Sequence, residues 1–298
     1  MKNIFRMVIS LLLSAVFVIL FLLGCYLPNY INSDAVVSIS SEDDGTITLM
    51  STNVRCLARE DILKKSWFYR ARLILEDINS VQPDIIGFQE ATFVHYDYLQ
   101  KVMVGYDCEM AYRDNFLLSE GCPIFWRTDK YEKVDSGAFW LSDTPDVMSK
   151  DWGSEHYRIC VYVILRELST GKEFAVFNTH LDHTSDLARI NGIAVVLDKI
   201  SELGNIPSFL MGDMNAKENS ETMKYTRESF EDAKISAGVE ENIPTYHNWG
   251  NPKKSKRIDY ILISKSDADV LEYDVVVNCY DGVYSSDHAS IYAKVKLK

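Results

Sequence analysis

Short strand-like segments recur along almost the whole chain, and they limit the folds that it can adopt. Each is rich in β-branched, aromatic or alternating apolar residues and ends at turn-forming residues. They lie at residues 46–54, 84–89, 123–126, 131–140, 160–168, 174–179, 208–211, 257–263, 270–278 and 289–297. Clear helical patterns occupy only residues 64–79, 94–102 and 185–203. Many strands with few helices argue against a doubly wound parallel sheet and favour an α/β fold of two packed, mixed β-sheets flanked by helices.

The N-terminus has the pattern of a secretion signal. Two basic residues precede an apolar run from Met7 to Leu23, and Gly24-Cys25 follow. Residues 22–25 resemble a bacterial lipobox, so we expect residues 1–25 to be a signal peptide that is cleaved before Cys25, which is then lipid-modified. The alternative is an uncleaved anchor helix, because a run of about 17 residues is at the lower limit for spanning a bilayer.

Both alternatives place the rest of the chain outside the cytoplasm, attached to a membrane through the N-terminus. Residues 26–45 are mostly polar and include an acidic run, so we expect them to form a flexible linker. The remaining residues, 46–298, show no Pro/Gly-rich break and no internal repeat. This indicates a single domain.

The charge of the chain argues against one class of partner. The formal net charge is −12, and residues 1–25 carry two basic residues and no acidic ones, so the remainder is near −14. Proteins that bind phosphate backbones tightly are basic on the binding face. We therefore expect no stable nucleic-acid complex. Separately, we expect a monomer. A low-affinity nuclease stays open, since a bound divalent cation inverts the local charge.

The cysteines beyond Cys25 give no metal-binding pattern. None of them forms a Cys-x-x-Cys pair, so a zinc site is not expected. An odd number leaves at least one free thiol, and burial within strands suits several of them. The residues are Cys56, Cys108, Cys122, Cys160 and Cys279.

Polar side chains suited to phosphoester chemistry follow several of the expected strands. One segment is Arg257-Ile258-Asp259-Tyr260, and the others supply Asn53, Glu90, His180, Asp213 with Asn215, and Asp287 with His288. Hydrolysis of a phosphoester needs a cation, an aligned water and a proton donor for the leaving group, and carboxylate, amide and imidazole groups supply these. Taken singly, Glu90 could be a helix-capping acid, and Asn53 or Asp213 could be a turn former.

In this order and at these strand ends, the segments resemble the endonuclease/exonuclease/phosphatase superfamily, from about Thr46 to Lys296. The resemblance implies a four-layered α/β sandwich whose site lies at one end of the two sheets. It also implies direct attack by water, because no Ser, Cys or His takes the place of a covalent nucleophile in the matching segments. Residues 136–145, Arg158 and residues 178–183 are similar to a bacterial branch that includes secreted and lipoprotein phosphoesterases.

The resemblance assigns a metal to three residues. Glu90 matches the main Mg²⁺ ligand, Asn53 matches a residue that helps hold the metal or the phosphate, and Asp287 contributes to the metal shell. A set of oxygen ligands suits Mg²⁺, with Mn²⁺ as the alternative. Where many relatives carry a further acid, two residues after Asn53, this chain has Arg55, which argues against a second metal there.

The same resemblance assigns the chemistry to the remaining residues. Asp213 orients or deprotonates the attacking water, and Asn215 binds a phosphoryl oxygen. His180 contacts the scissile phosphate and can act as an acid. His288 is the proton carrier, and Asp259 fixes its tautomer and raises its basicity.

Arg158 has two interpretations that the sequence leaves open. Its guanidinium could clamp a phosphate of the substrate, or it could form a salt bridge that supports the wall of the site. Two neighbours of His180 are also open: Asp182 could orient His180 or hold substrate, and His183 could be a loop residue.

The leading interpretation is a Mg²⁺-dependent phosphoesterase that acts on a phosphodiester or phosphomonoester outside the cytoplasm. One alternative is an extracellular nonspecific nuclease, which the negative charge disfavours. Another is a noncatalytic surface protein that keeps the scaffold for binding, against which the complete set of catalytic side chains argues. Aromatic residues that could line the site or lie in the core are Phe139, Trp140, Tyr246 and Trp249.

Overall fold

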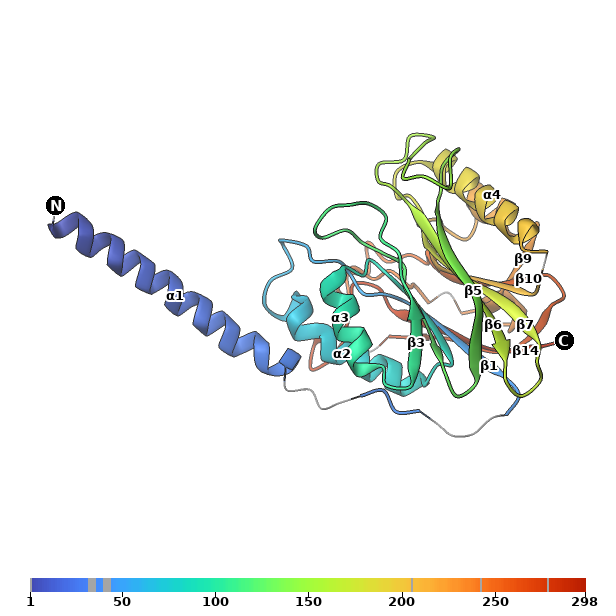
Figure 1. The fold of residues 1–298 in the computed structure, drawn as a ribbon, viewed down its shortest axis with the longest axis horizontal. Coiled ribbons are helices and arrows are strands. Elements are labelled where there is room, and N and C mark those ends of the chain that lie inside the picture. Colours follow the sequence, from blue (N-terminus) through green and yellow to red (C-terminus); the bar gives the residue numbers. More distant parts are fainter. Residues whose placement is uncertain (1, 32–35, 40–43, 205, 242, 278) are drawn as a thin grey trace.

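Two six-stranded β-sheets pack face to face, and helices cover their outer faces (Figure 1). The four-layered α/β sandwich expected from the sequence is therefore confirmed. The computed structural model describes residues 2–31, 36–39, 44–204, 206–241, 243–277 and 279–298. Between residues 2 and 31 it describes the side chains of residues 4–20 only.

The first sheet has the strand order β11-β14-β1-β2-β4-β3. Only β1 and β2 run parallel, and Asn53 at the end of β1 lies opposite Gln89 at the end of β2. Both strands therefore finish at one edge, with Glu90 immediately beyond it. The strands are β1 (Ile47–Asn53), β2 (Ile85–Gln89), β3 (Tyr106–Glu109), β4 (Ile124–Arg127), β11 (Ala268–Val276) and β14 (Ser290–Leu297).

The second sheet has the order β5-β6-β7-β8-β10-β9 and repeats this plan. Its only parallel pair is β7 with β8, in which His180 lies opposite Asp213. The antiparallel neighbour β10 places Asp259 on the other side of Asp213. The strands are β5 (Tyr131–Trp140), β6 (Ile159–Glu167), β7 (Glu173–His180), β8 (Ser208–Asp213), β9 (Phe230–Asp232) and β10 (Asp259–Ser264).

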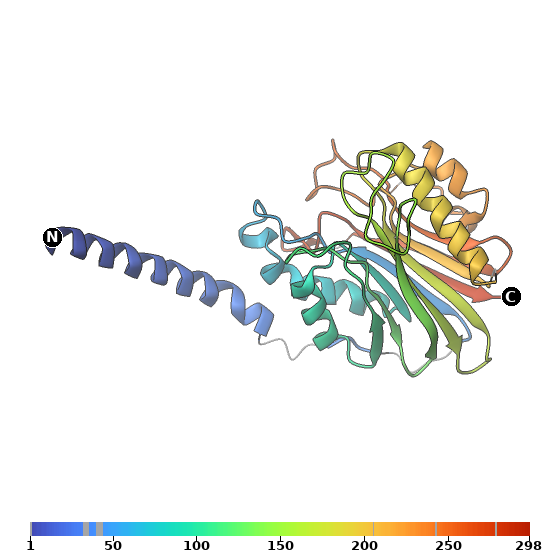
Figure 2. The same cartoon turned by 45° about the horizontal axis from the view of Figure 1, so that its top comes forward.

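Apolar side chains fill three spaces between the layers. Successive residues of a strand face opposite sides of its sheet, so one apolar strand can contribute to two of these spaces. In β8, Phe209 and Met211 lie between the sheets, whereas Leu210 lies beneath helix α4 (Asp186–Glu202). Helices α2 (Trp67–Val81) and α3 (Phe93–Val102) cover the first sheet, and α4 covers the second (Figures 1 and 2). The rigid sheets thus fix the positions of the side chains at their ends.

Several short elements were not predicted from the sequence. Each spans two to six residues, which is too short to show a hydrophobic period. They are β3, β9, η1 (Leu63–Lys65), α5 (Glu221–Thr226), α6 (Ala233–Ser236), β12 (Cys279–Tyr280) and β13 (Val283–Tyr284).

One helix, α1 (Lys2–Ile31), contains the expected signal and the first residues of the expected linker, and it projects away from the domain (Figure 1). Within the described residues, no helix combines the length and the hydropathy required to cross a bilayer. The side chain of Cys25 lies outside the described part of the chain. The signal peptide and the lipidation of Cys25 stay predictions.

Part of the expected linker, residues 26–45, is held against the domain. Val37 is buried, and its amide donates a hydrogen bond of 2.9 Å to the carbonyl of Val102 at the end of α3. The next amide, of Ser38, donates to Asn79 Oδ1 at 2.8 Å. Residues 36–39 are thus not a free tether, while residues 32–35 and 40–43 lie outside the described residues.

The cysteines beyond α1 form no disulfide among the described residues, so the expected free thiol is present. Burial was expected for Cys108, Cys122 and Cys160, and it is found for Cys122, just before β4, and for Cys160, in β6, but is only partial for Cys108. Cys108 is half-buried, and its Sγ lies 3.1 Å from the hydroxyl of Tyr96.

Candidate active site

The carboxyl ends of the two parallel strand pairs meet around one cavity of about 390 Å³. Two of the predicted residues, Asn53 and Asp259, support the wall from behind through hydrogen bonds to Glu90 and His288. The other predicted residues line the cavity: Glu90, Arg158, His180, Asp213, Asn215, Asp287 and His288. Segments far apart in the sequence therefore converge as the strand-end pattern predicted.

Asn53 links the two sheets. Its Nδ2 donates to Glu90 Oε1 at 3.0 Å and to Asp213 Oδ2 at 3.2 Å, so one amide spans the ends of β1, β2 and β8. Glu90 adopts a left-handed backbone conformation with φ of 61°, which is uncommon for a residue other than glycine and turns the chain sharply after β2. This turn aims its carboxylate into the cavity.

Glu90 is ionised in this setting. Burial alone would raise the pKa of its carboxyl group, but the positive charge of His288 and hydrogen bonds from Asn53 and from the amide of Cys56, at 2.7 Å, lower it well below its usual range. Two donors on one buried carboxylate stabilise its charged form. Glu90 therefore offers a fixed negative charge at the centre of the site.

His180 and Asn215 form a hydrogen-bonded pair at the end of β7. Asn215 Nδ2 donates to His180 Nε2 at 2.9 Å and to the carbonyl of Leu181 at 3.0 Å, so both of its amide protons are in use. Burial lowers the pKa of His180 well below its ordinary value, which agrees with a neutral ring that accepts at Nε2. In this arrangement His180 has no proton on Nε2 to donate, so action as an acid there would require a change of tautomer.

His288 forms the opposite case, a charged imidazole. Its Nδ1 lies 2.9 Å and 3.1 Å from the two carboxylate oxygens of Asp259, as the resemblance implied. Burial would lower the pKa of His288, but the charges of Asp259 and Asp213 raise it to about 10. Tyr246 packs edge-on against the ring, with centroids 4.9 Å apart. His288 is thus an imidazolium held between two carboxyl groups.

Asp213 lies between these two histidines. Its Oδ2 is 3.5 Å from His180 Nε2 and 3.7 Å from His288 Nε2. Burial and the negative charge of Asp259 raise the pKa of Asp213 to about 7. A carboxyl group with this pKa can both accept and release a proton near neutral pH.

Residues 50–288 match the sequence model of the Endonuclease/Exonuclease/phosphatase family. The chain belongs to this family. Its members are hydrolases that act on phosphoester bonds, so the protein is a hydrolase of the nuclease and phosphatase type. The family that the sequence segments resemble is confirmed.

Solved structures of bacterial family members have the same fold. An endonuclease/exonuclease/phosphatase from Bacteroides vulgatus has a TM-score of 0.80 at 27% identity, over 85% of this chain and 99% of that chain. A mannosyl-6-phosphatase from Bacteroides thetaiotaomicron has a TM-score of 0.74 at 29% identity, over 84% and 99% of the two chains. Nocturnin from Drosophila melanogaster is 28% identical over 167 residues, which are 51% of this chain but only 24% of that protein. The chain thus spans about a quarter of the length of that curated relative.

Enzymes of the endonuclease/exonuclease/phosphatase family generally depend on a divalent cation, and the residues present fit one. Asp287 Oδ1 is buried, and no hydrogen-bond partner for it exists among the described residues. The nearest cation to its other oxygen is Arg55 Nη1, at 3.9 Å, and burial raises the pKa of Asp287. A buried acceptor without a partner is costly, and a cation would satisfy it. With Glu90 it gives carboxylate oxygens in the cavity, the donors that hard cations prefer, and Asn53 supports Glu90 from behind.

Asp213, Asp259 and His288 also lie close enough to hold an ion, with ligand atoms within 4.8 Å of one another. Both oxygens of Asp259 are, however, within hydrogen-bond distance of His288 Nδ1. We interpret this triad as a proton relay in which Asp259 is hydrogen-bonded to His288 Nδ1 and Asp213 Oδ2 lies 3.7 Å from His288 Nε2. Glu90 and Asp287 then remain as cavity-lining residues to which the resemblance assigns a metal, and the ligand set that it gives with Asn53 stays a prediction.

Arg158 has the ion pair of one of the two interpretations that the sequence left open, and the phosphate clamp stays a prediction. Its guanidinium lines the cavity, and its Nε lies 3.7 Å from Asp182 Oδ2 in the wall. Asp182 itself does not line the cavity. Its carboxylate accepts hydrogen bonds from the amides of Glu155, Thr184 and Ser185, so it holds two loops together.

Of the four aromatic residues considered from the sequence, one lines the cavity, Tyr246. Phe139 is buried in the core beneath α4. Trp140 packs against the core between the sheets, and Trp249 lies 5.2 Å from the guanidinium of Arg70. The spacing of apolar residues in the sequence could not distinguish an aromatic residue that lines the cavity from one that lies in the core, because the end and the interior of a strand look alike in sequence.

Arg70 supports the site, and sequence reasoning gave it no role. This fully buried residue of α2 donates to the carbonyls of Val54, after β1, and of Ser285, in the loop that carries Asp287. Burial lowers its pKa to about 10, so it stays charged at neutral pH. The sequence feature that could have indicated this role is the position of a basic residue on the apolar face of the expected helix.

A loop between β3 and β4 adds a further ion pair to the cavity wall. Arg113 and Glu120 form a two-pronged pair with distances of 2.8 Å and 2.9 Å, and both residues face the cavity. Burial, followed by the charge of Glu90, raises the pKa of Glu120 to about 7. No strand or helix pattern marked this loop in the sequence.

Proposed function

We propose that this protein is a Mg²⁺-dependent phosphoesterase that cleaves its substrate by direct attack of water. The observation that carries the proposal is the position of Asp213 Oδ2. This oxygen lies 3.2 Å from Asn53 Nδ2, 3.5 Å from His180 Nε2 and 3.7 Å from His288 Nε2. A carboxylate that faces an amide, two imidazoles and a cavity is well placed to align and deprotonate a water beside a phosphoryl group.

The lining of the cavity favours water over a covalent nucleophile. Among its described residues there is no serine or threonine, and Cys56 supplies the only thiol. Burial together with the charge of Glu90 raises the pKa of this thiol well above its ordinary value. A thiol that stays protonated is a weak nucleophile, so water is the reactant that the site can activate.

Each side chain has a separate task in this scheme. A bound Mg²⁺, held by Glu90 and Asp287, with Asn53 supporting Glu90 through a hydrogen bond, would neutralise charge on the phosphoryl oxygens. Asp213 accepts a proton from the attacking water, and its pKa of about 7 suits a base that works near neutral pH. The imidazolium of His288 faces the negative charge that develops on the phosphoryl group and can supply a proton to the leaving oxygen.

The substrate that we propose is a small phosphorylated molecule, with a sugar phosphate as the first candidate. The cavity of about 390 Å³ lies at the small end of ligand pockets in general. Among the structural relatives, the mannosyl-6-phosphatase from Bacteroides thetaiotaomicron covers most of the chain. A nuclease is the second candidate, since curated relatives include Nocturnin and a yeast RNA exonuclease, but the net charge of −12 disfavours it.

We also propose that the enzyme acts outside the cytoplasm as a monomer attached to a membrane by its N-terminus. The support is the sequence of residues 1–25, with its basic start, apolar run and Gly24-Cys25. A stable complex with nucleic acid is not part of this proposal, because the charge of the domain opposes it.

Hydrolysis assays of the purified full chain test the function. A sugar 6-phosphate, a synthetic phosphodiester, single-stranded RNA and DNA are each offered with Mg²⁺ and with excess EDTA. We expect cleavage of small esters with Mg²⁺ only, loss of activity in Asp213→Asn, and normal activity in Asp269→Asn, an exposed aspartate far from the site. Rapid RNA cleavage with no activity on small esters would establish the nuclease instead. No cleavage of any substrate would overturn the proposal.

A further inference from the structure

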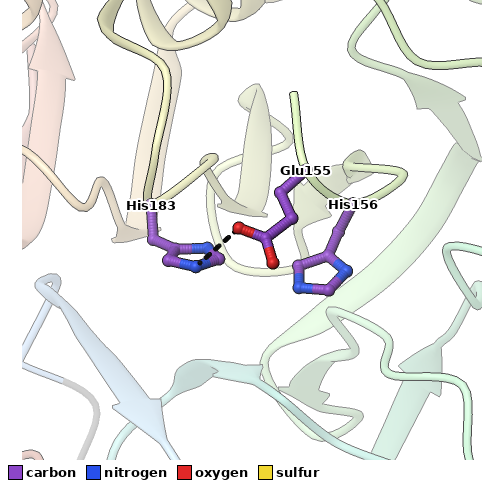
Figure 3. Close-up of side chains that lie close together, drawn as sticks. All are labelled: Glu155, His156 and His183. Carbon is purple, nitrogen blue, oxygen red and sulfur yellow. Dashed lines mark ion pairs between the residues drawn. The ribbon is translucent and has the colours of Figure 1, made fainter. Parts of the chain in front are cut away.

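A second group of potential metal ligands, drawn in Figure 3, lies at the mouth of the cavity, which His156 and His183 line. It consists of Glu155 and His156, in the loop before β6, and His183, in the loop after β7. One ligand atom from each lies within 4.8 Å of the others. Glu155 Oε2 is 3.3 Å from His183 Nε2, and the two imidazole rings are nearly parallel, 22° apart, with centroids at 5.6 Å. Figure 3 shows the three side chains turned toward one space.

This rim cluster, Glu155, His156 and His183, is open to solvent. The side chains of Glu155 and His183 are 53% and 45% exposed. In contrast, Asp213, Asp259 and His288 in the centre are all buried. An ion from solution can therefore reach the rim cluster without any change in the fold, and three protein ligands leave a coordination position for water or substrate.

The two loops that carry the rim cluster are held together before any ion binds. One oxygen of Asp182 accepts from Ser154 Oγ and from the amide of Glu155, both at 3.1 Å. The other accepts from the amides of Thr184 and Ser185, each at 3.0 Å. Asp182 thus fixes the backbone beside Glu155 and His156 relative to the backbone beside His183. Such preorganisation reduces the entropy lost when a ligand is bound.

The charges around the rim cluster select the kind of ion. Arg158 Nη2 lies 3.3 Å from His183 Nδ1, and Arg113 also lines this part of the cavity. These two guanidinium groups have carboxylate partners of their own, Glu120 and Asp182, so the rim cluster itself offers a cation a single carboxylate. A hard ion such as Mg²⁺ depends on charged oxygen ligands and is therefore disfavoured, whereas Zn²⁺ binds strongly to two imidazole nitrogens and a carboxylate.

We propose that Glu155, His156 and His183 form a zinc site at the mouth of the cavity, separate from the Mg²⁺ site in its centre. The absence of Cys-x-x-Cys pairs led us to expect no zinc site from the sequence, but that argument does not apply to a site built from histidine and glutamate. This inference goes beyond the proposed hydrolysis and does not depend on it.

Binding of Zn²⁺ at the rim cluster removes the hydrogen bond between Arg158 and His183. A guanidinium only donates hydrogen bonds, so His183 Nδ1 accepts from Arg158, and the ring proton lies on Nε2, facing Glu155. When Zn²⁺ bonds to Nε2, that proton leaves the nitrogen and the ring takes a proton at Nδ1, so the bond from Arg158 is lost. Arg158 is then free to contact an anionic substrate, and occupancy of the rim site would change the substrate KM.

Metal binding by the full chain tests the proposal without any activity assay. The protein is saturated with Mg²⁺ and titrated with Zn²⁺ by calorimetry, and with Co²⁺ by visible absorption. We expect one equivalent of Zn²⁺ to bind in the wild type, with affinity lowered at least about 100-fold in His183→Ala and in His156→Ala, since even outer residues of metal sites are worth 10–100-fold. Glu155→Gln should weaken binding as well.

Two controls separate the rim from the centre. Glu202→Gln removes an exposed carboxylate on α4 and should bind Zn²⁺ as the wild type does. Glu90→Gln removes a central ligand and should also leave Zn²⁺ binding unchanged. Binding that is lost in Glu90→Gln but kept in His183→Ala would place the ion in the centre, and it would overturn the proposal, as would no binding by the wild type. If one rim variant fails to fold, the variant on the other loop still decides the result.

Discussion

Replacing Asp259 with Asn should lower the pKa of His288 and make the rate of hydrolysis sensitive to pH. In the metal-free protein this pKa is raised from 6.5 to about 10, with Asp259 at 2.9 Å and Asp213 Oδ2 at 3.7 Å. An adjacent opposite charge contributes roughly 1–3 pH units to such a shift, so loss of Asp259 should lower the pKa by about 2 pH units, to about 8.

The direction of the effect follows from the raised pKa. In the wild type His288 stays protonated from neutral pH up to about 10, and the stability that its charge adds is fully present below pH 6.5 and is lost as the pH rises through about 10. In Asp259→Asn, roughly half of His288 would be neutral at pH 8. The rate of the variant should therefore fall between pH 7 and 9, where the wild type loses no activity through this group.

Nuclear magnetic resonance of the His288 ring in metal-free protein measures the pKa directly, and the rate profile is measured with saturating Mg²⁺. Because the two residues act as one unit, the double variant Asp259→Ala/His288→Ala should be little slower than His288→Ala alone. An unchanged pKa in Asp259→Asn, or fully additive losses of rate in folded protein, would refute a shared role for the pair.

Three further predictions concern other parts of the chain. Asp213→Asn should lower kcat by roughly 10²-fold or more with little change in KM, as loss of a general base does, and a wild-type kcat would exclude that role. Gly212→Ala should destabilise the fold by about 3 kcal/mol or more in denaturant unfolding, because φ is +139° and a Cβ would lie 1.9 Å from the carbonyl oxygen of Thr179; a normal midpoint would contradict this. Cys25→Ser should leave the precursor uncleaved or released from the membrane, whereas a full-length, membrane-bound product in both forms would support an anchor helix.

The strands and the central site could be predicted because both depend on local patterns. A run such as Phe209-Leu210-Met211 followed by Gly212-Asp213 carries its own evidence for a buried strand and for a polar residue at its end. Since the carboxyl ends of parallel strands meet at one edge of a sheet, residues that follow such strands are expected to lie close together. Asn53, Glu90, His180 and Asp213 were located at such strand ends, and the family resemblance supplied their roles and their common site.

Residues that act through tertiary contacts could not be predicted. Arg70 lies in a helix, and its partners are backbone carbonyls near Val54 and Ser285 that no side-chain pattern marks. The tie between Ser154 and Asp182 likewise joins loops 28 residues apart. The short strands β3 and β9 form because β4 and β10 offer them an edge of a sheet, a condition set by the fold and not by their own sequence.

Metal-dependent hydrolysis is tested most directly by the initial rate of phosphate release, measured for the wild type and Glu90→Gln with saturating Mg²⁺ and with excess EDTA. We predict that EDTA abolishes the wild-type rate, that added Mg²⁺ restores it, and that Glu90→Gln is slower by about 10²-fold or more at saturating Mg²⁺. Glu202→Gln should match the wild type throughout. A full wild-type rate in EDTA, or a Glu90→Gln variant as fast as the wild type, would contradict the assignment of the central site as a metal-dependent phosphoesterase.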